Sequence, residues 1–173
     1  NPFETAMYLS KQKELLAKVL KERDFLAFTS VTNNVSTFGF HENYMSSWDF
    51  QEFSEFHVKS LIPHFVSRMI YLGTGGVGKG DVFSISPRST FIENITSSAA
   101  VSERGMFLTR LDPLTTSGIR VQPICADHPV DEETIALMLG TSALTVRLGE
   151  LGLLPDTNIE WFKSIDIFSE VLG

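Results

Sequence analysis

The sequence predicts an α+β fold, in which helices pack on one face of a curved, mainly antiparallel sheet. Segments with apolar residues at every third or fourth position lie near both ends of the chain and in its middle. Short segments rich in β-branched and aromatic residues lie between them, bounded by turn-forming residues. This segregated order of helices and strands is typical of α+β proteins. A chain of 173 residues suits one domain, or a large piece of a bigger one.

The first and last helices are predicted from hydrophobic periodicity. In residues 3–23, apolar side chains such as Leu15 and Val19 recur at helical spacing, with Lys and Glu between them. Residues 130–151 show the same pattern and begin with acidic residues at 131–133. Negative charge in the first turn is favourable there, because it faces the positive end of the helix dipole.

The middle helix is predicted from its cap. Asp49 precedes a helical pattern that runs toward Arg68, and Glu52 occupies the capping-box position three residues later. Pro63 lacks an amide hydrogen, so we expect it to kink or divide this helix.

The remaining apolar segments are predicted to be strands. Asn33 and Asn34 mark a turn between the first two strands, and a glycine-rich turn separates the third from the fourth. The predicted strands are 25–31, 36–44, 69–72, 82–86, 91–95, 106–110 and 119–124. The segment 155–173 is amphipathic, and we expect it to pack against another surface.

The charge balance argues against nucleic acid as a ligand. The net charge is −7, so the basic surface that would neutralise the phosphates of DNA or RNA is lacking. The same balance disfavours an anionic membrane surface, and no apolar run approaches the roughly 18 residues that span a bilayer. Cys125 is the single cysteine, which fits a reducing, cytoplasmic location.

A glycine-rich segment at residues 73–80 nearly matches two phosphate-binding patterns, the dinucleotide G-x-G-x-x-G and the P-loop. Both patterns need a helix to begin at the loop, whereas residues 81–86 have the pattern of a strand. Gly80 also lacks the hydroxyl that would hold magnesium in a P-loop. We therefore interpret the segment as a hairpin turn. The alternative is a mobile substrate loop that uses Gly75, Gly76, Gly78 and Lys79 to contact substrate or phosphate.

Short motifs occur in a fixed order along the chain. Residues 38–44 are Phe-Gly-Phe-His-Glu-Asn-Tyr, and residues 61–68 end in Ser-Arg. Residues 83–88 end in Ile-Ser-Pro-Arg, residues 109–113 are Thr-Arg-Leu-Asp-Pro, and residues 139–144 are Leu-Gly-Thr-Ser-Ala-Leu. In this order and spacing they resemble the motifs of the Pup ligase and Pup deamidase/depupylase family, a carboxylate–amine ligase branch of the glutamine synthetase superfamily. The resemblance extends over about residues 25–154.

The resemblance implies a glutamine synthetase-like fold whose sheet lines a cleft for ATP and Mg²⁺. Ligases of the family phosphorylate a carboxylate with ATP and transfer it to a lysine amine, and close relatives hydrolyse the amide or isopeptide bond. Such chemistry needs positive groups that neutralise phosphate charge and a base that takes a proton.

Site roles are carried over from the resemblance. His41 and Asp112 would contact metal, or phosphate in the case of His41. Arg88 and Arg110 would bind phosphate or a substrate carboxylate through their planar guanidinium groups, and Lys79 would add to the nucleotide site. The alternatives are a histidine bonded within the sheet and arginines in surface salt bridges. Glu42 would point to the opposite face of the strand from His41, in a structural role, paired with an arginine.

The sequence departs from the family pattern at several polar positions. Pro87 stands where the family has glutamine, and Leu111 where it has an acidic residue. Residues 125–128, Cys-Ala-Asp-His, replace a Gly-Asp-Ala-Asn-like stretch. The family's opening strands, with its main magnesium carboxylates and catalytic aspartate, and its C-terminal part have no counterpart, so we expect residues 1–173 to form a single partial catalytic domain. The catalytic residues are therefore not assigned.

Three functions remain open from the sequence. The first is part of an ATP- and Mg²⁺-dependent carboxylate–amine (isopeptide) ligase acting on a protein tag or another carboxylate substrate. The second is a deamidase or depupylase-like amide hydrolase of the same fold. The third is a non-catalytic binding or assembly subunit. The first two expect a partner chain or a missing segment that completes the active site.

Overall fold

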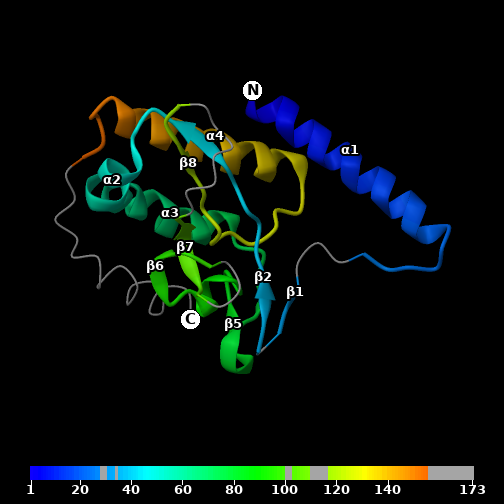
Figure 1. The fold of residues 1–173 in the computed structure, drawn as a ribbon. Helices are drawn as coiled ribbons and strands as arrows, with labels where there is room; N and C mark the ends of the chain where they lie inside the picture. Colours follow the sequence, from blue (N-terminus) through cyan, green and yellow to red (C-terminus); the bar gives the residue numbers. More distant parts are fainter. Residues whose placement is uncertain (28–30, 34, 100–102, 110–116, 156–173) are drawn as a thin grey trace.

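The computed structural model describes residues 1–27, 31–33, 35–99, 103–109 and 117–155. Its α-helices are α1 (Pro2–Lys21), α2 (Phe50–Glu52), α3 (Val58–Leu72) and α4 (Glu132–Glu150), with a π-helical turn at Phe53–His57 that joins α2 to α3 (Figure 1). Short 3₁₀ turns lie at Lys79–Asp81 and Ser89–Phe91. The three helical segments expected from periodicity are therefore present.

The described strands form four two-stranded pairs. The strands are β1 (Val31–Thr32), β2 (Thr37–Phe38), β3 (Tyr44–Ser46), β4 (Gly76–Val77), β5 (Phe83–Ser84), β6 (Asn94–Ser97), β7 (Gly105–Leu108) and β8 (Ile119–Val121). The pairs β1–β2, β3–β8 and β4–β5 are antiparallel, and β6–β7 is parallel. The α+β class is thus as predicted, with small two-stranded sheets in place of one regular curved sheet.

Isolated bridges connect these pairs. Phe40 pairs with Ala126, and the Glu42 amide donates to the carbonyl of Pro123. Phe107 in turn pairs with Pro123. The chain before β3 therefore lies beside the chain after β8, which lies beside β7.

Several predicted boundaries are corrected by the structure. Residues 69–72, predicted to be a strand, are the last turn of α3, and residues 25–27 are not in a strand. Pro63 lies inside α3, which continues through it, and the irregular turn instead precedes Val58. The Asp49 cap is confirmed, since Asp49 accepts from the Glu52 amide and Glu52 reaches back to the Asp49 amide.

The main core lies between α3, α4 and the strands β7 and β8. Phe65 of α3 contacts Phe107 of β7 edge to face, with ring centroids 5.0 Å apart. Leu61, Met69 and Val121 are also fully buried. Packing of this kind fixes α3 and α4 against these strands.

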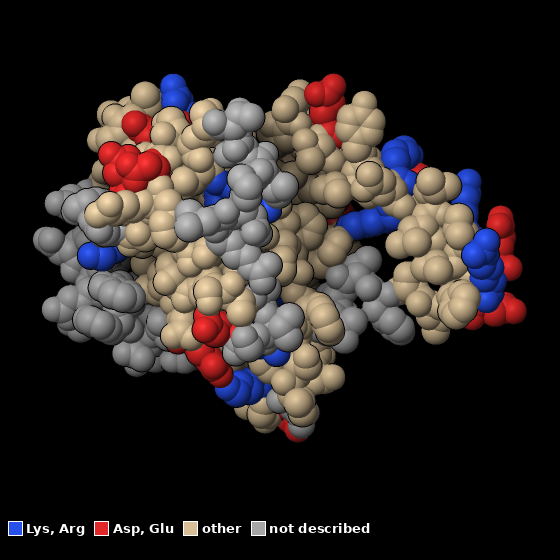
Figure 2. Space-filling model, in the orientation of Figure 1, with Lys and Arg blue, Asp and Glu red and all other residues tan. Residues whose placement is uncertain are grey.

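Helix α1 extends away from this core (Figures 1 and 2). Ala6 near its start is buried against Ile135 and Ala136 of α4. Leu15 and Leu16, farther along, are 64% and 52% exposed. Figure 2 shows Lys and Arg side chains in separate small groups on this face, several of them next to acidic side chains.

Candidate active site

The segment from His41 to Ser46 has two different faces. His41, Asn43 and Met45 are exposed, whereas Glu42, Tyr44 and Ser46 are buried. Successive side chains of an extended strand point to opposite faces. This segment therefore presents one set of polar groups outward and another toward α3 and α4.

The inner face carries a buried ion pair. Arg68 of α3 donates from Nη1 and Nη2 to the two carboxylate oxygens of Glu42, at 2.7 and 2.5 Å, and both side chains are fully buried. Tyr44 donates its hydroxyl to the same carboxylate at 2.5 Å. Burial alone would lower the pKa of Arg68, but the Glu42 charge outweighs it and raises that pKa. The predicted structural role of Glu42, paired with an arginine, is confirmed.

The ion pair extends to α4 through Ser142. Arg68 Nη1 also donates to Ser142 Oγ at 2.7 Å, and His64 Nε2 lies 3.0 Å from the same oxygen. An arginine has no acceptor, so Ser142 Oγ accepts from it and its proton is free for His64 Nε2. His64, neutral at pH 7, therefore shares with Ser142 a hydrogen bond whose direction depends on the histidine tautomer. Burial, followed by the Arg68 charge, lowers its pKa to about 4.

The neutral state of His64 predicts a dependence of stability on pH. The pKa of His64 is lower in the folded protein than the ordinary value of 6.5 that it has in the unfolded chain. As the pH falls, the unfolded chain therefore takes up a proton on this histidine before the folded protein does. Stability that is present above pH 6.5 is therefore lost as the pH falls toward 4. We expect a loss on the order of 1–2 kcal/mol, discounted for partial exposure. Urea denaturation at several pH values, compared between the wild type and His64→Gln, measures it.

Glutamine at position 64 can still accept from Ser142 but does not titrate, so its stability should change less over this range. Parallel curves for the two proteins would show that His64 does not carry the effect.

One arginine lies near the outer face, and a second shares a backbone acceptor with it. Arg88 is buried, and its guanidinium donates to the carbonyl of Ile124 from Nε (3.2 Å) and Nη2 (3.0 Å), and to that of Thr37 from Nη1 (3.4 Å). Arg104 Nη1 donates to the same Thr37 carbonyl at 3.0 Å. Burial, and then the Arg88 charge, lowers the pKa of His41. Positive charge is thus concentrated near an exposed, neutral histidine.

Gly39 allows this close arrangement. A Cβ at position 39 would lie 2.6 Å from Arg88 Nε, 3.0 Å from the Ile124 carbonyl oxygen and 3.1 Å from that of Ala126. The Arg88 side chain therefore packs directly against the backbone of Gly39. This explains the glycine of the Gly-x-His-Glu-Asn-Tyr motif through packing rather than through a turn.

Asp127 holds the segment that carries Arg88. Its Oδ2 accepts from Ser86 Oγ at 2.5 Å, and its Oδ1 accepts from the Arg88 amide at 2.9 Å. Burial raises the pKa of Asp127, and the hydrogen bond from Ser86 partly opposes that shift. The sequence analysis did not assign a site role to Asp127. The signal in the sequence was a single acidic residue that follows a strand, in a stretch whose other residues are also buried.

The glycine-rich segment forms a hairpin, as predicted. Its strands β4 and β5 pair antiparallel around the 3₁₀ turn, and no helix begins there. Gly75 has φ +65°, a conformation that favours glycine. The Lys79 amide donates to Thr90 Oγ1, and its ammonium pairs with the exposed carboxylate of Glu93 at 2.9 Å. The structure thus places Lys79 in a surface ion pair, with Gly76 and Gly78 in the same hairpin.

Other candidates from the sequence are placed as follows. Arg110 and Asp112 lie outside the described residues. Cys125 is fully buried, burial raises its pKa, and its near polar neighbour is Arg68 Nη2 at 3.8 Å. His128 bonds to the Pro129 carbonyl. A thiolate–histidine pair at 125 and 128 is therefore not formed.

His57 and His64 are both packed against other side chains. His57 stacks on Trp48, with ring centroids 4.2 Å apart, and His64 contacts Ser142. Among the described residues, no group of three or more His, Cys, Asp or Glu side chains is arranged to hold a metal ion.

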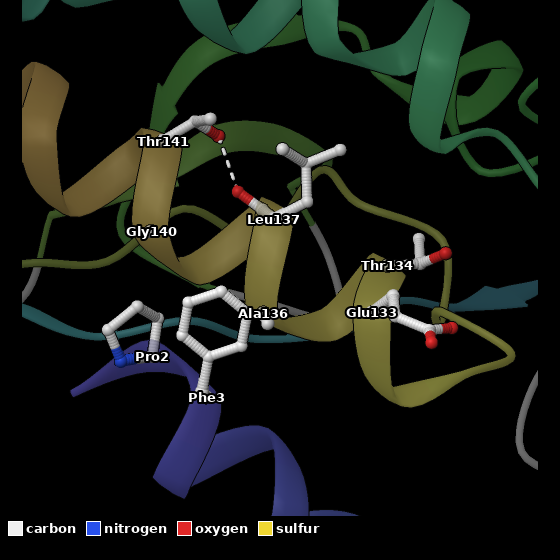
Figure 3. A pocket seen from close by; sticks show the side chains of 8 residues that line it. All are labelled: Pro2, Phe3, Glu133, Thr134, Ala136, Leu137, Gly140 and Thr141. Carbon is white, nitrogen blue, oxygen red and sulfur yellow. Dashed lines mark hydrogen bonds between the residues drawn. The ribbon is translucent and has the colours of Figure 1, made fainter.

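A cavity of about 530 Å³ lies at the junction of α1 and α4. Figure 3 shows Pro2 and Phe3 of α1 facing the α4 residues that complete its wall. Among the residues that the structure describes, Glu133 is its single ionisable lining residue, and none of the described site candidates lines it. The chemistry expected from the motifs is therefore not located in this cavity. Within the described part of the chain, no helix is long and apolar enough to cross a bilayer.

Known proteins are similar to this chain over most of its length. The family model described as Pup-ligase protein matches residues 9–167. A Pup–protein ligase of Kineococcus radiotolerans is 32% identical over 136 residues, which cover 75% of this chain and 29% of that protein. A Pup deamidase/depupylase of Mycobacterium tuberculosis is 34% identical over 131 residues, which cover 69% and 26%. The chain thus spans less than a third of the length of these relatives.

The fold is similar to that of a solved structure. The Pup ligase PafA in complex with ADP aligns with 98% of this chain and 39% of its own, with a TM-score of 0.64 and 23% sequence identity.

Proposed function

The chain belongs to the Pup ligase family, and we propose that it forms part of an ATP-dependent carboxylate–amine ligase that joins the small protein Pup, or a similar carboxylate tag, to a lysine of a target protein. The observation that supports this most is the exposed His41 near Arg88, whose guanidinium shares the Thr37 carbonyl as acceptor with that of Arg104. Positive charge held in this way attracts the phosphates of a nucleotide. The ADP bound by the similar PafA structure supports the nucleotide class.

The residues have different roles in this proposal. Arg88 is buried and supplies fixed positive charge behind His41, while the half-buried Arg104 is the guanidinium with better access to a phosphate. His41 is neutral at pH 7 because its pKa is lowered, so its ring has a nitrogen lone pair available as a ligand or acceptor. Phosphate binding remains the proposed role of Arg110. Lys79, in the hairpin, is proposed to contact the nucleotide from the edge of the site.

Magnesium is proposed as the companion of the nucleotide phosphates. Mg²⁺ prefers oxygen ligands in octahedral geometry, and the described residues do not bring enough carboxylates together for such a set. His41 would contribute one ligand, and Asp112 would supply an oxygen. The remaining ligands would come from other parts of the complete enzyme. The same proposal includes a curved sheet like that of glutamine synthetase, formed by these strands in the complete enzyme.

A hydrolase of the same fold is the second candidate. A depupylase of Acidothermus cellulolyticus is 32% identical over 129 residues, as similar as the ligase of Kineococcus radiotolerans. Incubation of the complete enzyme with a Pup-conjugated protein separates the two functions. Release of Pup without ATP turnover indicates the hydrolase, and ATP-driven conjugation indicates the ligase.

Binding of Mg·ATP to this chain tests the proposal directly. Wild-type protein should bind Mg·ATP in isothermal titration calorimetry, and Arg104→Ala and His41→Ala should each weaken binding about tenfold, the loss expected for one charge-assisted contact. Arg23→Ala is the matched control, because Arg23 is exposed near the end of α1 and far from the motifs. Because the remaining magnesium ligands would come from other parts of the complete enzyme, absence of Mg·ATP binding by that enzyme, not by this chain alone, would favour a non-catalytic binding subunit.

A further inference from the structure

The extended segment that carries His41, residues 41–46, is held from its inner side by polar contacts to α4. At one end, Ser142 accepts from Arg68, which holds Glu42. At the other end, Glu150 accepts from Ser46 Oγ at 3.1 Å and from the Ser47 amide at 2.6 Å. The hydrogen bond from Arg147, and then that from the Ser47 amide, lowers the pKa of Glu150 to about 2, so this anchor stays ionised at neutral pH.

The arginine sets the direction of its own contacts in this network. Arg68 can only donate, so Glu42 and Ser142 both accept from it. Tyr44 donates to Glu42, and His64 Nε2 lies within hydrogen-bond distance of Ser142 Oγ. Loss of the Arg68 contacts would leave the buried carboxylate of Glu42 without its charged partner, which is costly at low dielectric. The network therefore defines one arrangement of the strand.

The shape of the arginine adds to this restraint. The Arg68 guanidinium lies over the Phe65 ring, with Cζ 4.3 Å from the centroid. Its planar fork meets the two oxygens of Glu42 at once. Because the Arg68 guanidinium is held both by the Phe65 ring and by the two Glu42 oxygens, it fixes the orientation of the carboxylate as well as its distance from Arg68.

The direction of Glu42 sets the direction of its neighbours. Since adjacent side chains of a strand point to opposite faces, a strand whose Glu42 is fixed inward must present His41 and Asn43 outward. We propose that Arg68 and Ser142 are positioning residues, which act through Glu42 to hold His41 and Asn43 toward the nucleotide site. The part that concerns the nucleotide rests on the function proposed above.

Backbone amides report this positioning without any ligand. The Phe40 amide donates to the Ala126 carbonyl, and the Glu42 amide donates to that of Pro123. The amides of Leu108 and Ile124 donate to Gln122 and Met106 elsewhere in the same ladder. Hydrogen exchange of the first pair measures local opening of the His41 strand, and the second pair measures opening of the neighbouring strands.

The experiment compares Ser142→Ala with two controls in the 173-residue chain. Ser142→Thr keeps the hydroxyl, and Thr141→Ala removes a hydroxyl that bonds only within α4, to the Leu137 and Met138 carbonyls. In Ser142→Ala we expect exchange at Phe40 and Glu42 to accelerate about tenfold, the loss of one buried hydrogen bond. The Leu108 and Ile124 amides should change less than threefold. Mg·ATP affinity should fall by about the same factor of ten, and both controls should behave like wild type.

Each outcome decides between positioning and bulk stability. If Phe40, Glu42, Leu108 and Ile124 accelerate equally, Ser142 stabilises the whole domain and the positioning role is wrong. If exchange at Phe40 and Glu42 does not change, the role is also wrong. If the complete enzyme fails to bind Mg·ATP, the proposed function is wrong, while the exchange measurement on this chain still decides whether Ser142 and Arg68 hold the segment.

Discussion

Replacement of Arg68 by methionine should lower the free energy of unfolding by about 3–5 kcal/mol, the cost of removing one partner from a buried ion pair. Glu42 would remain in a fully buried site, with the Tyr44 hydroxyl as its remaining donor among the contacts described above. Ser142 would also lose its strongest donor. Urea denaturation at pH 7, followed by tryptophan fluorescence and circular dichroism, measures the loss.

The double variant Arg68→Met with Glu42→Gln is the control for the charge. It removes the unpaired carboxylate while keeping a side chain of similar size, so much of the lost stability should return. Lys11→Met disrupts the exposed Lys11–Glu14 pair and should change stability by less than about 0.5 kcal/mol. A loss below about 1 kcal/mol in Arg68→Met would mean that water or a shifted side chain replaces the arginine.

Substitution of Gly39 by alanine should cost about 2–3 kcal/mol through overpacking. The added methyl would approach the carbonyl oxygens of Ile124 and Ala126, which are backbone atoms, as well as the Arg88 side chain. Backbone on the opposing strand cannot retreat without breaking the Phe40–Ala126 bridge. Thermal and urea denaturation should therefore both report a less stable protein.

The matched control for this substitution is Gly140→Ala in α4. There the new Cβ meets only Pro2, with its nearest atom at 3.3 Å, and alanine gains up to about 1 kcal/mol of helix propensity over glycine. We expect a stability within about 1 kcal/mol of wild type. Equal losses at positions 39 and 140 would contradict the close approach of Arg88 to the strand.

The helix caps could be predicted because they depend on residues close in sequence. Asp49 needs only the amide and side chain of Glu52, and Asp131 accepts from the nearby Thr134 amide. The end of α3 could not be predicted in the same way, because Met69 to Leu72 is an apolar run that suits a strand equally well. Its helical state follows from burial of Met69 and Leu72 on the side that continues from Phe65.

The site was predictable in part. Strand alternation predicted that Glu42 and His41 face opposite sides, but which arginine pairs with Glu42 depends on how α3 packs. The motif that contains Ser142 could be found in the sequence as a family resemblance. The contact of Ser142 with Arg68 could not, because the two residues lie 74 positions apart. Arg88 was expected to bind phosphate or a substrate carboxylate, with a surface salt bridge as the alternative, yet it is buried under Gly39. Long-range contacts of this kind depend on the tertiary packing, which local patterns do not determine.

The alternation from His41 to Ser46 also limits how this region can change during evolution. An insertion or deletion of one residue there would exchange odd and even positions, so that the carboxylate of Glu42 would turn to solvent and the imidazole of His41 would turn to the guanidinium of Arg68. The side proposed to face the nucleotide and the core side would fail together. Substitutions can alter one side at a time, but a change in length alters both, so this segment should tolerate changes of residue type far better than changes in length.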